Sequence, residues 1–231
     1  MIIVVLLLGA VYLALAKRLA PVPFMRAWFA VVLLTNILIT GACTWALDQL
    51  RHFGVPRKIT QMLCCYFCHF TFRCVLFWNP QSPVVVSEYN QKWSDLKGPC
   101  AVMLNHTSFY DAFTYVGMSP MKSLWNCKTL MKDSLRRIPV FGPVFDRLGH
   151  FPVYFKSDAE GNFTLDKERQ QPVTDEMNRH LRDGGRLAMF PEGAVNKDPR
   201  SLQPFRYGIF QTCIDHKLPI YYCLLVGCNE C

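Results

Sequence analysis

The chain has 231 residues, of which 51% are hydrophobic and 18% are charged, and its formal net charge is +8. This length allows one substantial domain and does not require a second. A positive charge of this size suits either nucleic acid or an anionic membrane surface. Because no recognition helix or aromatic-basic RNA motif is present, we expect a phospholipid membrane as partner and no nucleic acid.

Two uncharged runs near the N-terminus, residues 2–16 and 27–47, predict two membrane-embedded helices. The second run has 21 residues, about the number needed to cross ~30 Å of hydrocarbon. Basic residues lie on both sides of it, and the positive-inside rule directs both flanks to the cytosol. Residues 1–58 are therefore predicted to be an N-terminal membrane anchor, a shallow helical hairpin rather than two full crossings. No basic residue precedes the first run, which favours an anchor over a signal peptide.

The following segment, residues 59–82, is apolar but contains His69 and Arg73, which predicts an amphipathic connecting helix on the membrane surface. From residue 83 onward, short apolar runs alternate with polar turns and helical stretches. This texture predicts an α/β domain over 83–231 with a largely parallel sheet flanked by helices. No metal is expected, because Cys228 and Cys231 supply only half of a zinc site and the other cysteines are scattered.

The first candidate site follows the apolar run 101–104 and contains Asn105, His106, Ser108 and Asp111. The sequence predicts a strand, a turn and then a helix, so that Asp111 in the first helical turn folds back towards the imidazole of His106. Neutral histidine can accept a hydroxyl proton, and a carboxylate on its other ring nitrogen fixes the tautomer. Taken alone, however, such a pair is more often a loop histidine bonded to a helix cap.

The second candidate site follows the apolar run 186–189 and consists of Phe190, Pro191, Glu192 and Gly193. It too comes directly after a predicted strand. Because the carboxyl ends of parallel strands meet at one edge of a sheet, we expect both groups to form one shared site.

These two groups, together with the segment KDSLRRIPVFG at 132–142, resemble the glycerolipid acyltransferase family typified by lysophosphatidic acid acyltransferases. The resemblance covers about residues 85–226 and implies an α/β fold with a membrane-apposed active site. It also implies a thioester donor, either acyl-CoA or an acyl carrier protein, and no cofactor beyond that co-substrate. By the same resemblance His106 is the general base and Asp111 its partner, with substrate-binding roles for Asn105, Ser108, Lys156, Phe190, Pro191, Glu192 and Gly193.

The chain departs from the family pattern at three places. Lys156 stands where the family usually has an arginine for the acceptor's phosphate, and lysine cannot grip a phosphate bidentately. After Gly193 the family's Thr-Arg-Ser is replaced by Ala-Val-Asn, for which Lys197 or Arg200 is a candidate substitute. Glu192 is expected to accept a bond from a glycerol hydroxyl or to organise basic groups. The chain also ends soon after the last matched strand, which leaves open a C-terminally truncated or minimal form.

The expected function is that of a membrane-bound O-acyltransferase that transfers a fatty acyl group from acyl-CoA to the sn-2 hydroxyl of lysophosphatidic acid, giving phosphatidic acid. A His-Asp general-base mechanism needs no acyl-enzyme, because the acceptor supplies the nucleophile. The alternatives are an acyltransferase or CoA-independent transacylase for another lysophospholipid, and an inactive membrane adaptor on the same scaffold. We expect an integral or monotopic membrane protein whose active site faces the cytosol, at the endoplasmic reticulum or, alternatively, the bacterial inner membrane.

Overall fold

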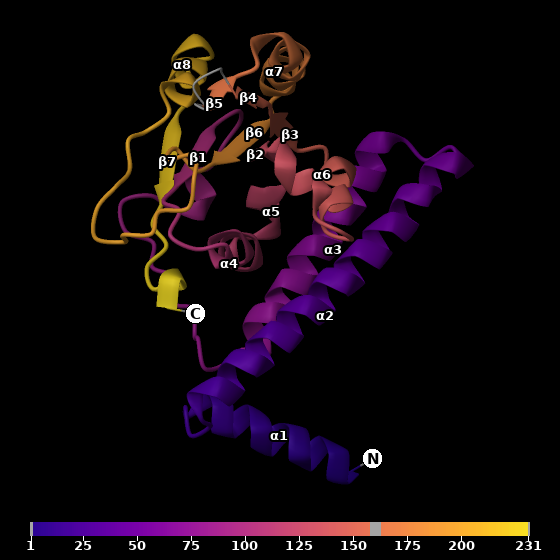
Figure 1. Ribbon diagram of the computed structural model, residues 1–231. Coiled ribbons are helices and arrows are strands. Elements are labelled where there is room, and N and C mark those ends of the chain that lie inside the picture. Colours follow the sequence, from indigo (N-terminus) through magenta and orange to yellow (C-terminus); the bar gives the residue numbers. More distant parts are fainter. Residues whose placement is uncertain (1, 158–162, 231) are drawn as a thin grey trace.

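The computed structural model describes residues 2–157 and 163–230 and contains a parallel sheet between layers of helices, with further helices extending from it (Figure 1). The helices are α1 (Ile2–Ala16), α2 (Val22–Gln49), α3 (Arg57–Phe77), α4 (Tyr110–Met118), α5 (Met121–Leu124), α6 (Gly142–Leu148), α7 (Lys167–Arg182) and α8 (Tyr207–Asp215). The strands are β1 (Ala101–Leu104), β2 (Cys127–Lys132), β3 (Phe151–Val153), β4 (Phe155–Ser157), β5 (Phe163–Leu165), β6 (Arg186–Met189) and β7 (Ile220–Cys223).

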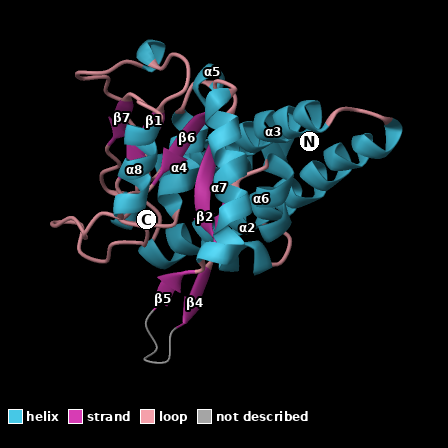
Figure 2. Cartoon of the chain, turned by 90° about the horizontal axis from the view of Figure 1, so that it is seen from above, coloured by secondary structure: helices cyan, strands magenta, loops and turns pink. Residues whose placement is uncertain are grey.

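The main sheet has the strand order β3-β2-β6-β1-β7, and every neighbouring pair in it is parallel. The carboxyl ends of its strands therefore meet at one edge, where ligands usually bind in such sheets. Strands β4 and β5 form a separate antiparallel pair that projects beyond the main sheet (Figure 2). The predicted α/β fold with a largely parallel sheet is confirmed.

Both faces of the sheet are covered by helices because side chains along each strand alternate between the two faces. Along β1, Val102 and Leu104 join one core, which also contains buried residues of α3, α4 and α6. Ala101 and Met103 join the other core, which contains buried residues of α7 and α8. All four residues of β1 are buried, which places this strand at the centre of the domain.

Helices α2 and α3 form an antiparallel pair, with the turn between them at one end (Figure 1). Small and polar residues lie between the two helices: Thr40 Oγ1 donates to Thr71 Oγ1 at 2.9 Å. Arg147 of α6 holds α2 from the side, because its Nη1 donates to Gly41 O at 3.1 Å and to Thr44 Oγ1 at 3.2 Å. Near the other end of α2, the ring of Phe29 contacts that of Tyr110 edge to face, with centroids 5.1 Å apart.

The predicted anchor and connecting helix correspond to α1, α2 and α3. Two segments, Val22–Phe53 and Arg57–Phe77, are long and apolar enough to cross a membrane by length and composition. Helix α1 lies at an angle to the α2–α3 pair and carries exposed apolar side chains, among them Leu6, exposed by 66%, and Leu13, exposed by 60% (Figure 1). Helix α3 covers most of the stretch 59–82, and its buried side includes Phe72 and Val75 of the domain core, while Phe70 and Phe77 are exposed. The predicted place of this helix on the membrane surface stays a prediction.

Candidate active site

The loop between β1 and α4 is organised by the carboxylate of Asp111, which is fully buried. Its Oδ2 accepts hydrogen bonds from the backbone N–H groups of Thr107 at 2.7 Å and Ser108 at 2.9 Å. The same oxygen lies 3.1 Å from His106 Nδ1. A buried carboxylate needs such donors to offset its loss of hydration. The strand-turn-helix arrangement predicted for these residues is therefore present, with the carboxylate folded back onto the imidazole.

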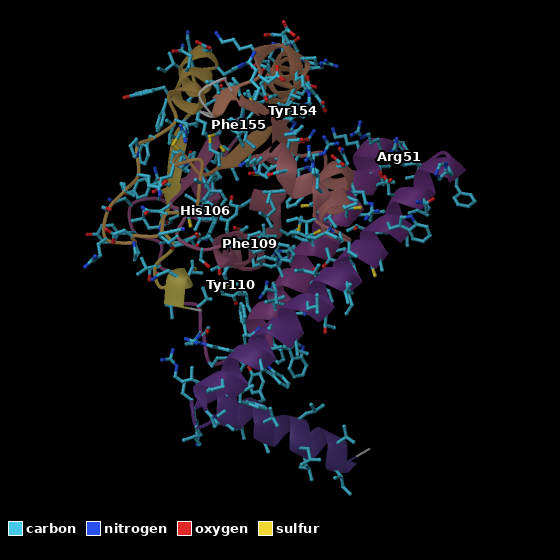
Figure 3. The ribbon with its side chains drawn as sticks, in the orientation of Figure 1. Arg51, His106, Phe109, Tyr110, Tyr154 and Phe155 are labelled. Carbon is cyan, nitrogen blue, oxygen red and sulfur yellow. The ribbon has the colours of Figure 1, made fainter. Side chains whose placement is uncertain are left out.

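The imidazole of His106 is oriented by two contacts. Hydrogen bonding to the carboxylate places the proton on Nδ1, which leaves Nε2 as the nitrogen that can accept another proton. The ring of Phe190 stacks on the imidazole, with centroids 4.0 Å apart and planes inclined by 21°. The His106 side chain remains 17% exposed, so it is accessible at the edge of the sheet (Figure 3).

Glu192 joins the two loops that the sequence singled out. Its side chain is buried, with 2% exposure, and its Oε1 accepts a hydrogen bond from the His106 backbone N–H at 3.2 Å. Its Oε2 accepts from Asn196 Nδ2 and from the Gln203 backbone N–H, both at 2.9 Å. The backbone N–H of Asn196 in turn donates to His106 O. The structure thus brings Phe190 and Glu192 against His106 and gives Glu192 a positioning role; its direct contact with an acceptor hydroxyl stays a prediction.

Asn105 and Ser108 also hold the loop in place. Asn105 Nδ2 donates to Leu225 O at 2.8 Å, and the Leu225 N–H donates to Asn105 Oδ1 at 2.7 Å. Ser108 Oγ accepts from the backbone N–H of Tyr110 at 3.1 Å, beside the start of α4. Both side chains therefore have backbone partners. Their contact with substrate stays a prediction.

The turn after β6 depends on Gly193, whose φ of +70° lies in the left-handed region that favours glycine. The Gly193 N–H donates to Phe190 O at 3.0 Å, and the carbonyl of buried Pro191 accepts from the Arg206 N–H at 2.8 Å. Arg206 thereby lies beside this turn, although it is far along the chain. Sequence reasoning missed it, because no motif or fixed spacing connects it with Gly193.

Lys156 lies on β4, which follows β3, and three strand spacings of ~4.8 Å, roughly 14 Å, separate β3 from β1 in the main sheet. The role of Lys156 at the acceptor's phosphate stays a prediction. The nearer segment after β2 contains Arg136, whose guanidinium pairs with Asp133 at 3.2 Å and with Asp146 at 2.8 Å.

The other titratable groups of the domain favour structural roles. Every cysteine in the described part of the chain is a free thiol, and burial raises the pKa of Cys127 to about 12, which keeps it neutral. Burial, with the charge of Lys128 as a smaller cause, lowers the pKa of His150 to about 3, and its Nδ1 accepts from the Thr129 N–H at 3.3 Å. Among the described residues, no group of three His, Cys, Asp or Glu side chains is placed to hold a metal ion.

Comparison with known proteins agrees with this arrangement. The solved structure of the 1-acyl-sn-glycerophosphate (LPA) acyltransferase PlsC from Thermotoga maritima matches with a TM-score of 0.60 over 85% of this chain and 70% of that chain, at 17% identity, which shows a shared fold. The Caenorhabditis elegans protein named "Putative 1-acyl-sn-glycerol-3-phosphate acyltransferase acl-2" is 26% identical over 155 residues, covering 65% of this chain and 49% of that protein. The chain thus spans about half the length of that relative. A family model described as Acyltransferase matches residues 84–225, more than half of the chain, and the chain therefore belongs to the acyltransferase family.

Proposed function

We propose that the protein is a membrane-bound lysophospholipid acyltransferase that transfers an acyl group from acyl-CoA to the sn-2 hydroxyl of lysophosphatidic acid. The observation that carries the proposal is the His106–Asp111 pair, with its 3.1 Å contact and a stacked Phe190 that together orient Nε2. The name of the Caenorhabditis elegans relative, which refers to 1-acyl-sn-glycerol-3-phosphate, supports this acceptor.

In the proposed reaction the acceptor supplies the nucleophile. Nε2 of His106 takes the hydroxyl proton as the oxygen attacks the thioester carbonyl, and buried Asp111 stabilises the imidazolium. The carbon–sulfur bond then breaks, and the imidazolium returns its proton to the departing thiolate. The products are the ester and free coenzyme A, and no acyl-enzyme forms. General-base assistance of this kind contributes roughly 10²- to 10⁴-fold in rate.

The helices outside the sheet support a lipid substrate. The exposed apolar side chains of α1 and the apolar lengths of α2 and α3 suit contact with hydrocarbon. An enzyme held at the bilayer can take its acceptor directly from the membrane while the thioester arrives from the aqueous side. We place the active site on the cytosolic face, with the endoplasmic reticulum as the expected location and the bacterial inner membrane as the alternative.

A second candidate is acyl transfer to a different lysophospholipid, or a CoA-independent transacylation. A lysine at position 156, where the family usually has an arginine, and the absence of a cation at Ala194 and Val195 favour this alternative. An inactive adaptor is disfavoured, because an adaptor has no need for a histidine whose tautomer and ring plane are both fixed.

The test is acyl transfer from labelled oleoyl-CoA to lysophosphatidic acid by the purified full chain in lipid vesicles. We expect product with the wild type and a loss of about 10²- to 10⁴-fold in His106→Ala. His69→Ala is the matched control, since His69 lies on α3 and its Nδ1 contacts Val116 O at 2.8 Å, away from the reacting pair. Product with lysophosphatidylcholine but not with lysophosphatidic acid would support the second candidate. No product from oleoyl-CoA with any acceptor, in a folded protein, would leave CoA-independent transacylation and the adaptor.

A further inference from the structure

Arg206 lies across the turn that follows β6. Its backbone N–H donates to Pro191 O at 2.8 Å, which ties the residue to the turn. A Cβ atom placed on Gly193 would lie 3.0 Å from Cγ and 3.2 Å from Nε of Arg206, so the arginine side chain passes directly over the glycine. The absence of a side chain at Gly193 therefore allows the positive φ and also leaves space for the arginine side chain.

The charge of Arg206 has no partner within the described part of the chain. No carboxylate there lies within ion-pair distance of its guanidinium. Glu192, the carboxylate of the same turn, is buried and its oxygens are engaged by His106, Asn196 and Gln203. Arg206 is exposed, and an exposed arginine without a counter-ion can bind an anionic ligand.

The turn and the loop beside Arg206 both contact His106. Phe190, in the same turn, stacks on His106, and Asn196, in the loop that leads to Arg206, donates its N–H to His106 O. By contrast, Arg200 is bound to Asp198 at 3.1 Å and its side chain is 90% exposed. Unlike Arg200, Arg206 is thus tied to the turn through its backbone N–H.

The surroundings of Arg206 are apolar. Its neighbour Phe205 is 40% exposed and Leu202 is 66% exposed. A guanidinium matches the planar spacing of two phosphate oxygens, and exposed apolar side chains beside it suit an amphiphile. We infer that Arg206 binds the phosphate of a lipid substrate during acyl transfer, in place of the cation that the sequence lacks after Gly193. This inference rests on the proposed function for the identity of the amphiphile.

Two substrates bring a phosphate to this edge of the sheet: the lysophospholipid acceptor and the coenzyme A of the donor. Steady-state kinetics of Arg206→Gln separates them when each substrate is varied with the other saturating. We expect KM for one substrate to rise about 10- to 100-fold, since a hydrogen-bonded contact with a charged group is lost. We expect kcat to stay within about threefold, because His106 and Asp111 are untouched, and Arg206→Lys to recover part of the loss.

Arg182→Gln is the matched control, since Arg182 is an exposed arginine at the end of α7, next to the amino end of β6. It should leave both KM values unchanged. A rise confined to lysophosphatidic acid identifies the acceptor's phosphate, and a rise confined to oleoyl-CoA identifies the donor's. Both KM values within twofold of the wild type in Arg206→Gln would overturn the inference.

A wild type that transfers no acyl group would count against the proposed function. A binding experiment tests the role of Arg206 even then. Tryptophan fluorescence of the full chain in detergent micelles is titrated with lysophosphatidic acid, oleoyl-CoA and neutral monoacylglycerol. The inference is supported if the wild type binds a phosphate-bearing ligand more tightly than monoacylglycerol and Arg206→Gln does not. The two proteins must have equal melting temperatures. Equal preference in the two proteins, or none in the wild type, contradicts the inference.

Discussion

The loops at the carboxyl edge of the sheet and the α2–α3 pair are stabilised in different ways. At the loops, the buried carboxylates of Asp111 and Glu192 each accept several hydrogen bonds and so fix the position of His106. Between the helices, the polar contacts are fewer and include the bond of Thr40 with Thr71, while large apolar side chains cover the outside. Directional bonds fix atoms for chemistry, whereas apolar surface fixes only which side of a helix faces away from water.

The largest expected effect is that of Asp111→Asn on the rate of acyl transfer. Asp111→Asn retains the size of the side chain but removes the charge that stabilises the imidazolium, so we expect kcat to fall about 10²- to 10⁴-fold. The melting temperature should stay close to that of the wild type, so that the loss of rate does not come from unfolding. Asp198→Asn is the control, because Asp198 is an exposed carboxylate of the loop after β6 that bonds locally to Arg200 and Ser201. Equal rates in Asp111→Asn and the wild type would remove the proposed mechanism.

At Glu192 the main effect should be on stability. Glu192→Gln puts an amide N–H₂ where one oxygen now accepts from His106, Asn196 or Gln203, so at least one buried donor loses its acceptor. We expect the free energy of unfolding to fall by about 2–3 kcal/mol, with activity falling as the His106 loop loosens. Denaturant titration in detergent measures this, and Glu168→Gln, at an exposed position of α7, should stay within about 0.5 kcal/mol of the wild type.

Gly41 tests how tightly α2 packs against the domain. A Cβ at Gly41 would meet the side chain of Val140 and lie 3.0 Å from Val140 O, so Gly41→Ala should push α2 away from the segment that precedes α6. Overpacking costs about 1–3 kcal/mol, less up to ~1 kcal/mol for the better helix propensity of alanine. Gly9→Ala is the matched control in α1, where nothing lies within 4 Å. A stability gain in both variants would show that the contact at Gly41 is loose.

The smallest expected effect is the pH dependence contributed by His150. Its folded pKa of about 3 lies below the unfolded value of about 6.5, so the unfolded chain binds the proton first as the pH falls. The neutral histidine therefore contributes fully above pH 6.5, and its contribution is lost progressively towards pH 3. Between pH 7 and pH 6 we expect a loss of about 0.7 kcal/mol in the free energy of unfolding. His150→Gln keeps an acceptor for the Thr129 N–H and should lack this part of the slope.

The contact between His106 and Asp111 was predictable because its signal is local. His106 and Asp111 lie within one strand-turn-helix unit, and the alternation of strands with helices fixes the edge at which Phe190 and Glu192 also lie. The partners of Glu192 were not predictable, since a sequence shows a carboxylate but not the backbone N–H groups that surround it. Arg206 was missed for a related reason: only the folded turn brings it over Gly193.

For the helices, the sequence predicted less of the packing than of the secondary structure. A helix was predicted within 59–82, and a helix is observed at Arg57–Phe77. Its membership of the domain core was not visible, because Phe72 and Val75 suit hydrocarbon and a protein interior equally well. Lys156 illustrates the effect of a strand break: β3 ends at Val153, and the lysine belongs to the β4–β5 pair.

The contacts of α2 with the domain limit how far this helix can extend across the bilayer. Phe29 touches Tyr110, and Thr44 is bonded to Arg147, so the helix is in contact with the domain at two points separated by roughly 22 Å at ~1.5 Å per residue. A crossing of ~30 Å would carry the domain's flank, with the charged Arg147, into the hydrocarbon. We therefore expect α2 to lie along one leaflet with its free side towards the lipid, which keeps His106 at a constant height above the membrane surface.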